Sequence, residues 1–167
     1  MQPNDIAALQ SLALSHDSAA ANTAFTDLTA IGTNEGVQFY LHLLESDKAN
    51  WRNKAASGLA QIADPQAIEP LLRAIQKPEA RNRNGTLVYA LTSFDCRHLL
   101  KELFLIVFYQ GYEAQLMALI ALEDQEFEYS AEDVEFVRQH WHIASQAPSS
   151  SLAEFGLTTI GEMIEEL

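Results

Sequence analysis

The side chains with the most chemical potential in this 167-residue sequence are five histidines and one cysteine. The histidines are scattered along the chain, at His16, His42, His98, His140 and His142. His140 and His142 are two residues apart, and on a helix two such side chains point in different directions. One cysteine cannot build a thiolate site, and the sequence has no His-Glu-x-x-His motif. We therefore expect no metal ion and no other cofactor.

Cys96 is the one candidate thiol nucleophile. At the start of a helix, the helix dipole could lower its pKa, but a small buried side chain is the commoner state of a cysteine. His98 is too close along a helix to be aimed at the sulfur. The nucleophile-elbow and phosphate-loop motifs are also absent. The sequence therefore predicts a protein that is not an enzyme, with no catalytic residue.

The single cysteine also excludes an internal disulfide, which suits a reducing compartment. No lysine or arginine precedes Lys48, so the positively charged start of a signal peptide is missing. No apolar stretch reaches the roughly 18 residues that a membrane-spanning helix needs. We expect a cytoplasmic protein that does not associate with membranes.

Negative charge is concentrated at one end of the chain. The net charge is −13, and residues 111–167 contain twelve acids and one base, Arg138. Such a field repels phosphates and anionic lipids, so we expect no nucleic-acid partner. A basic protein is the natural complement, although plain solubility would also explain the charge.

The densest acidic run is residues 123–135, with seven acids in thirteen positions and no base. Two aromatic residues, Phe127 and Tyr129, lie within it. The acids could steer a basic partner while the aromatics anchor it. Alternatively, the aromatics fold under the loop and cover the core. The candidate binding residues here are Glu123, Asp124, Glu126, Phe127, Glu128, Tyr129, Glu132, Asp133 and Glu135.

The elements that must position these residues follow from an internal repeat of 31 residues. A shift of 31 places Leu28 on Leu59, and comparable shifts align further apolar sets. Spacings of three, four and seven within each set are typical of amphipathic helices, two per repeat. The aligned sets are Ala24, Leu28 and Ile31 with Ala55, Leu59 and Ile62, and Val37, Leu41 and Leu44 with Ile68, Leu72 and Ile75 and with Leu99, Leu103 and Ile106.

The turns within the repeats have suitable chemistry. Gly32 fits a helix C-cap, and Asp64 with Pro65 fits a helix start. Pro70 should kink the helix that follows. Ser130 and Asp133 should form a capping pair for a helix from about 131 to 145. We expect Leu28, Leu59, Leu72 and Leu103 to be almost fully buried.

A second candidate surface is the polar side of the helix before Asp64. If Leu59 points into the core, then Asn53, Ser57 and Gln61 point outward and form a surface of low charge. Their counterparts 31 residues earlier are Asn22, Thr26 and Ala30. Stacked-repeat proteins commonly bind partners through such a face.

Residues 50–76 resemble a HEAT repeat, in the short form shared with phycobilin lyase subunits. The resemblance rests on Arg52, the pair Ala55 and Ala56, Leu59, Asp64-Pro65, and Ile68 followed by Leu71 and Leu72. It implies an all-α protein, a right-handed α–α superhelix (solenoid) of about four helix pairs plus a C-terminal capping helix. The expected divisions are repeats near 18–48, 49–79, 80–110 and 111–146 within residues 1–146, a linker at 147–151, and an amphipathic helix at 152–167.

These observations favour a non-catalytic protein-binding module that is monomeric when free. Small acidic solenoids resemble the immunity proteins with which bacteria occlude toxic effectors, so an inhibitor of a basic toxin is the most concrete hypothesis. An adaptor or assembly factor of a multiprotein complex is one alternative, and a chromophore-lyase-like subunit is another.

Overall fold

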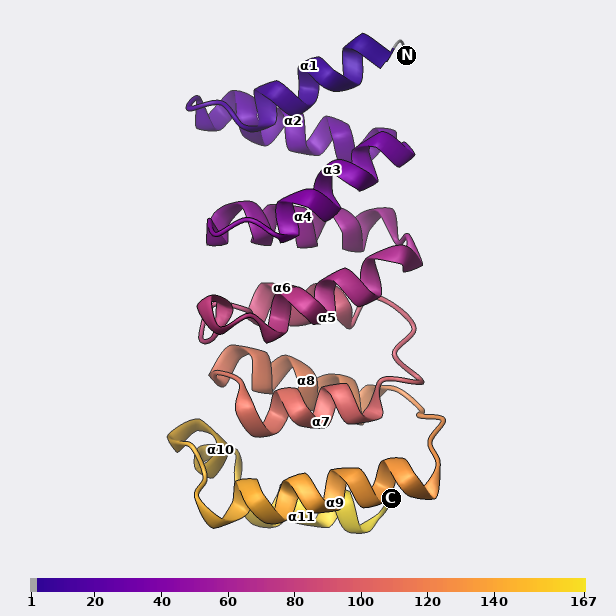
Figure 1. Cartoon of the computed structure of the whole chain (residues 1–167), viewed down its shortest axis with the longest axis vertical. Helices are drawn as coiled ribbons and strands as arrows, with labels where there is room; N and C mark the ends of the chain where they lie inside the picture. The colour runs from indigo at the N-terminus through magenta and orange to yellow at the C-terminus, as the bar shows by residue number, and fades with distance from the viewer. Residues whose placement is uncertain (1–2) are drawn as a thin grey trace.

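The computed structural model describes residues 3–167, and every regular element in this range is a helix (Figure 1). The α-helices are α1 (Pro3–Ala13), α2 (Ser18–Ile31), α3 (Asn34–Leu44), α4 (Ala49–Ile62), α5 (Ile68–Gln76), α6 (Gly85–Leu91), α7 (Leu100–Tyr109), α8 (Tyr112–Asp124), α9 (Ala131–Gln146), α10 (Ser150–Phe155) and α11 (Leu157–Glu165). Two single-turn 3-10 helices, Pro65–Ala67 and Pro78–Ala80, lie in the connections on either side of α5.

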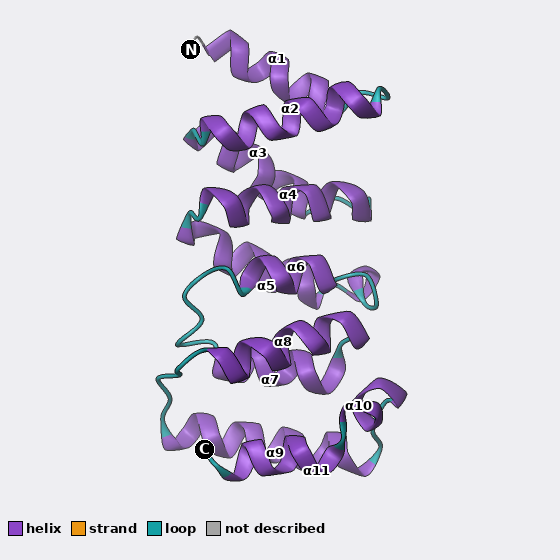
Figure 2. Cartoon of the chain, turned by 180° about the vertical axis from the view of Figure 1, so that it is seen from behind, coloured by secondary structure: helices purple, strands orange, loops and turns teal. Residues whose placement is uncertain are grey.

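The helices form two layers along the long axis of the molecule. The front layer consists of α1, α3, α5, α7 and α9 and faces the viewer in Figure 1. The back layer contains α2, α4, α6 and α8 and is seen in Figure 2, where α11 lies over α9. Within the back layer, α4 packs against α2 and α6, and α6 packs against α8. The first and last described helices, α1 and α11, lie at opposite ends of this stack (Figure 1).

The apolar core lies between the two layers. Leu28, Leu59 and Leu103 are 0% exposed and Leu72 is 7% exposed, which confirms the burial predicted from the 31-residue spacing. The small residues Ala55, Ala56 and Gly58 are also buried and let α4 lie close to its neighbours. One helix cannot cover its own apolar face, so each pair depends on the pairs beside it.

Most of the predicted caps are present. Gly32 ends α2 with φ +59°, a conformation that glycine adopts without strain. Asp64 accepts a hydrogen bond from the backbone N–H of Gln66. At the start of α9, the Ser130 hydroxyl accepts from the Asp133 N–H, and the Asp133 carboxylate accepts from the Ser130 N–H. These contacts confirm the start and stop signals read from the sequence.

The predicted kink at Pro70 was wrong, because the α-helix starts later than expected. The turn Pro65–Ala67 is a 3-10 helix, and α5 begins at Ile68. Pro70 therefore lies in the first turn of α5. Backbone N–H groups at a helix start have no partner within the helix, so a proline there removes no hydrogen bond.

The C-terminal region also differs from the prediction of one helix over 152–167 after a linker at 147–151. The first helix, α10, starts at Ser150, and its cap is Ser149, whose hydroxyl accepts from the Leu152 N–H. Gly156 then separates α10 from α11. Its φ is +92°, a backbone conformation that residues other than glycine rarely adopt. Both pieces still contribute to the core through Leu152, Ile160 and Ile164.

The close contact between α3 and α4 yields a test of the packing. A Cβ added at Gly58 would lie 2.8 Å from the ring of Tyr40, whereas one added at Gly36 would meet only ordinary contacts at 3.6 Å. Tyr40 is fully buried and stacked on Phe25, so its ring cannot move aside easily. We expect Gly58→Ala to lower the free energy of unfolding by about 1–3 kcal/mol through overpacking.

The matched control is Gly36→Ala, which should be neutral or stabilising because alanine is the better helix former. Urea unfolding followed by circular dichroism measures both variants. Equal stabilities for Gly58→Ala and Gly36→Ala would contradict the packing of Tyr40 against α4.

Candidate functional site

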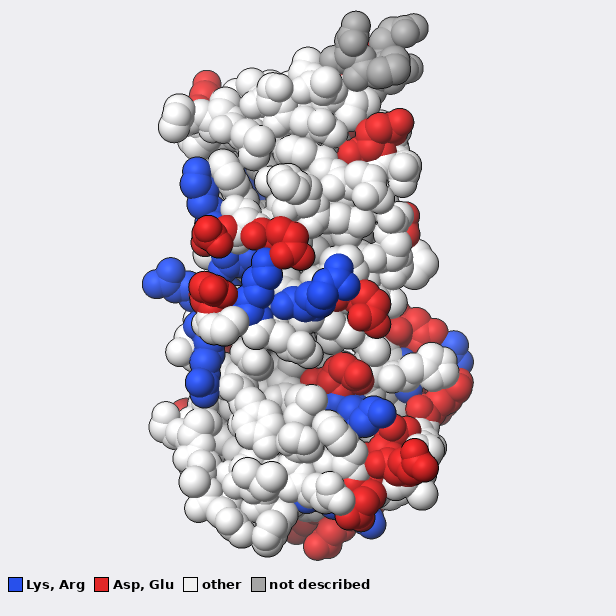
Figure 3. All heavy atoms as spheres, viewed as in Figure 1, with Lys and Arg blue, Asp and Glu red and all other residues white. Residues whose placement is uncertain are grey.

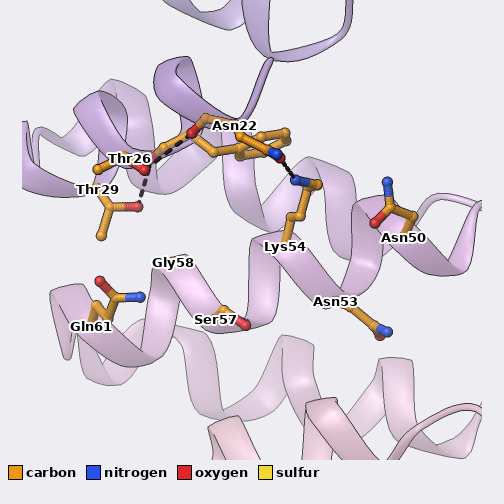
Figure 4. Close-up of a pocket in the computed structure, with 10 residues that line it drawn as sticks. Asn22, Thr26, Thr29, Asn50, Asn53, Lys54, Ser57, Gly58 and Gln61 are labelled. Carbon is orange, nitrogen blue, oxygen red and sulfur yellow. Dashed lines mark hydrogen bonds between the residues drawn. The ribbon is translucent and has the colours of Figure 1, made fainter. Parts of the chain in front are cut away.

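A polar groove lies between α2 and α4 on the back layer, with a volume of about 420 Å³ (Figure 4). The predicted residues Asn53, Ser57 and Gln61 all line it. Two of their expected counterparts on α2, Asn22 and Thr26, line it as well, whereas Ala30 does not. The full lining is Asn22, Phe25, Thr26 and Thr29 from α2 and Asn50, Asn53, Lys54, Ser57, Gly58 and Gln61 from α4.

The two helices are held beneath the groove by Tyr40 of α3. Its hydroxyl donates to the carbonyl oxygen of Phe25 at 2.7 Å and lies 2.7 Å from the Thr29 hydroxyl. Its ring fits against α4 because Gly58 has no side chain. Burial raises the pKa of this phenol, so Tyr40 stays neutral and acts as a structural support.

Some of the groove's polar groups are already used within the protein. The Thr26 hydroxyl donates to the Asn22 carbonyl at 3.1 Å, and the Thr29 hydroxyl donates to the Phe25 carbonyl at 2.9 Å. The Lys54 ammonium donates to the side-chain oxygen of Asn22, as Figure 4 shows. These bonds fix the α2 wall and the position of Lys54.

The polar groups on α4 are mostly unused. Within residues 3–167, the side chains of Asn50, Ser57 and Gln61 are exposed and form no hydrogen bond to another residue. The Asn53 Oδ1 atom is buried and also lacks a donor. The Asn53 side chain is directed away from the α2 wall in Figure 4, so this buried oxygen is not presented to a ligand in the groove. Through the other three side chains, the groove can recognise a ligand by neutral hydrogen bonds.

The groove continues into a neighbouring hollow of about 610 Å³ toward α1, which shares Asn22, Phe25, Asn50 and Lys54 with it. Trp51 lines this hollow, and the Lys48 ammonium lies 3.8 Å from the centre of its ring. Among the residues that the structure describes, no aspartate or glutamate lines either hollow. The arrangement thus offers hydrogen bonds and aromatic surface but no carboxylate for acid–base chemistry.

The acidic segment 123–135 lies elsewhere, between α8 and α9, toward the opposite end of the stack (Figure 1). Acidic side chains gather along the lower right edge in Figure 3, which views the front layer. The structure therefore does not bring the two predicted surfaces together. Its exposed acids are Glu123, Asp124, Glu126, Glu128, Glu132 and Glu135.

The two aromatic residues of this segment behave differently. Phe127 is half-buried and packs against the core, as in the alternative in which the loop covers the core. Tyr129 is 42% exposed, and its hydroxyl donates to the Leu167 carbonyl at 3.4 Å. Tyr129 alone is thus open to a partner.

Two of the acids form ion pairs within the chain. Glu128 lies 3.2 Å from the Arg97 guanidinium and 3.7 Å from the His98 ring. Asp133 lies 2.6 Å from the Lys101 ammonium, and this contact together with the Ser130 cap lowers the pKa of its carboxyl to about 2. These acids tie the segment to α7 and its preceding turn.

Cys96 is buried, and its environment is the reverse of that of an activated thiol. Burial raises the thiol pKa to about 11, and Sγ donates to the Leu91 carbonyl at 3.4 Å. The buried state, which is the commoner one for a cysteine, is confirmed, and no helix dipole acts on the thiol because Cys96 lies in the turn before α7, which starts at Leu100. His98 is exposed beside Glu128.

Sequence reasoning missed Gln125 as the residue that organises this turn. Its side-chain oxygen accepts from the Cys96 N–H at 3.1 Å, and its amide nitrogen donates to the Thr92 carbonyl at 3.4 Å. Nothing in the residue's type or spacing distinguishes it from a solvent-exposed glutamine.

Comparison with known proteins gives no family assignment: no family model matches the chain, and no match appears among curated proteins. Within residues 3–167, no three or more histidine, cysteine or acidic side chains are grouped in a way that could hold a metal ion. No described helix combines the length and apolar character needed to cross a bilayer.

The state of Cys96 can be measured directly. With a pKa of about 11, the folded protein should contain almost no thiolate near pH 8. We expect labelling by Ellman's reagent to be at least about 100-fold slower in the folded chain than in the chain unfolded by guanidinium. Equal rates in the two states would contradict the burial of the thiol and restore Cys96 as a candidate nucleophile.

Proposed function

We propose that this chain is a non-catalytic protein-binding module, a right-handed α-solenoid of HEAT-like helix pairs that holds a polar segment of a partner protein between α2 and α4. The two-layer packing and the match between the 31-residue spacing and the buried leucines support the solenoid architecture. The relationship to the short HEAT repeat remains part of this proposal.

One observation carries the proposed function: unpaired, uncharged hydrogen-bonding groups from α4 face a groove whose other wall is rigidly held. Asn50, Ser57 and Gln61 offer free donors and acceptors to a ligand in the groove. Asparagine and glutamine side chains match the N–H and C=O pattern of a peptide backbone. An extended or looped peptide segment can therefore satisfy these groups without an ion pair.

The most concrete form of this function is an immunity-type inhibitor of a basic partner such as a toxin effector. The supporting feature is the negative charge of residues 111–167, which contain twelve acidic residues and one basic residue. A field of this kind speeds the encounter with a basic protein, while short-range contacts set the lifetime of the complex. The acidic end would steer the partner, and the groove would hold it.

The groove can be tested with the partner recovered by affinity capture from the native host. Ser57→Arg places a long cation over the groove, and Ser57 is exposed, so the fold should be kept. We expect the dissociation constant to rise by about 30-fold or more, corresponding to about 2 kcal/mol lost at an interface centre.

Ser11→Arg is the matched control, because it makes the same change at an exposed position on α1 in the front layer. It should change the dissociation constant by less than about threefold. The melting curves of both variants are compared first. Surface plasmon resonance then measures the dissociation constant of each variant. Unchanged affinity in Ser57→Arg would reject the groove as the binding site.

Steering by the acidic segment has a separate kinetic signature. Replacing Glu123, Asp124, Glu126 and Glu132 by their amides leaves the paired Glu128 and Asp133 intact. We expect association to slow by about tenfold at low salt and to lose most of its salt dependence, with dissociation little changed. Stopped-flow mixing at two salt concentrations measures both rates. Association as fast and as salt-dependent as in the parent would show that the charge only keeps the protein soluble.

A further inference from the structure

A second cavity opens in the front layer, where α5 and α7 do not pack as closely as their neighbours. The contacts that join α3 to α5 and α7 to α9 are not repeated between α5 and α7. The cavity has a volume of about 370 Å³. It is lined by Leu72, Ile75 and Gln76 of α5, by Glu102, Leu105, Ile106, Tyr109 and the following Gln110 at α7, and by His140 of α9.

The walls of this cavity are largely apolar, and one carboxylate stands among them. Leu72 and Ile106 are buried, and Leu105 is half-buried. Glu102 is half-buried too, and its Oε2 atom is enclosed with no hydrogen-bond donor among the described residues. At the other end, the Tyr109 hydroxyl lies 3.0 Å from Nδ1 of His140, so these two groups are already paired.

Among the described residues, no lysine or arginine forms a hydrogen bond or ion pair with Glu102, although Lys101 is close enough for its charge to interact with this carboxylate. Neither lysine nor arginine is among the residues that line the cavity. Lys101, the next residue along α7, is engaged with Asp133 at 2.6 Å. On and beside α5, Lys77 is paired with Glu45, and Arg73 is exposed. A carboxylate oxygen buried without a donor is unfavourable, so the cavity is suited to a ligand that brings donors.

We propose that this cavity binds the side chain of an arginine or lysine from a basic partner protein. The aliphatic stem of such a side chain would lie against Leu72, Leu105 and Ile106, and its charged head would donate to Glu102. The apolar residues Leu72, Leu105 and Ile106 beside the unpaired carboxylate of Glu102 match this chemistry.

The cavity and the polar groove lie on different layers of the molecule. The cavity is built from front-layer helices, whereas the polar groove is built from α2 and α4 of the back layer. A segment held in the groove therefore does not cover the cavity, and both can be occupied together. Two sites on opposite layers are what an adaptor between two protein segments needs.

The test uses agmatine, a four-carbon chain with a guanidinium group at one end and an ammonium group at the other, and therefore does not depend on the partner or on the groove. In ¹H–¹⁵N NMR spectra of the full chain, we expect saturable shifts for amides in residues 72–76 and 102–110. Glu102→Gln keeps the side-chain size and should raise the dissociation constant by about tenfold or more, since a charge-assisted bond becomes a neutral one.

Glu69→Gln is the matched control, because Glu69 is an exposed acid on α5 outside the cavity. It should bind agmatine like the parent. Leu105→Phe offers a second route, since it fills the cavity without touching the carboxylate, and it should weaken binding as well.

Three outcomes would overturn the proposal. The first is the absence of saturable shifts in the parent, as expected if Arg73 of the same chain fills the cavity. The second is a set of shifts centred on residues 123–135. The third is equal affinity in Glu102→Gln and Glu69→Gln.

Discussion

The structure depends on burial of an apolar face that no single helix pair can cover. Leu28, Leu59 and Leu103 are completely enclosed and belong to one hydrophobic core cluster. Each fully buried leucine contributes roughly 1.5–3 kcal/mol relative to exposure. The polar groove results from this packing. Tyr40 holds α2 against α4, and its ring fits there because Gly58 has no side chain.

The same constraint explains which features could be predicted from the sequence. Helix geometry fixes which side chains share a face, so the burial of Leu59 and the exposure of Ser57 and Gln61 follow from spacing alone. Asn22 and Thr26 were placed opposite them by the 31-residue shift, and both line the groove. Helix caps such as Gly32 and Ser130 could also be predicted, because they depend only on neighbouring residues in the sequence.

Features that depend on distant contacts could not be predicted. The cavity beside Glu102 exists because α5 and α7 pack loosely, and no periodicity in the sequence encodes that gap. The raised pKa of Cys96 arises from burial in a turn that Gln125 of another segment holds. Gly156 was read as part of a continuous helix, because helical periodicity on both sides of it hides the change in backbone direction. The acidic residues of the segment 123–135 form a charged surface, as their sequence predicts, but Phe127 packs inward against the core.

The central claim is that a partner makes its hydrogen bonds with the unpaired amide side chains of α4. The most direct measurement is the side-chain NH₂ resonances of Asn50 and Gln61 in ¹H–¹⁵N NMR spectra recorded with and without the captured partner. The account predicts that these two pairs of signals shift on binding, while those of Gln139 and Gln146 on α9 keep their positions. A complex that forms while the signals of Asn50 and Gln61 stay unchanged would contradict it.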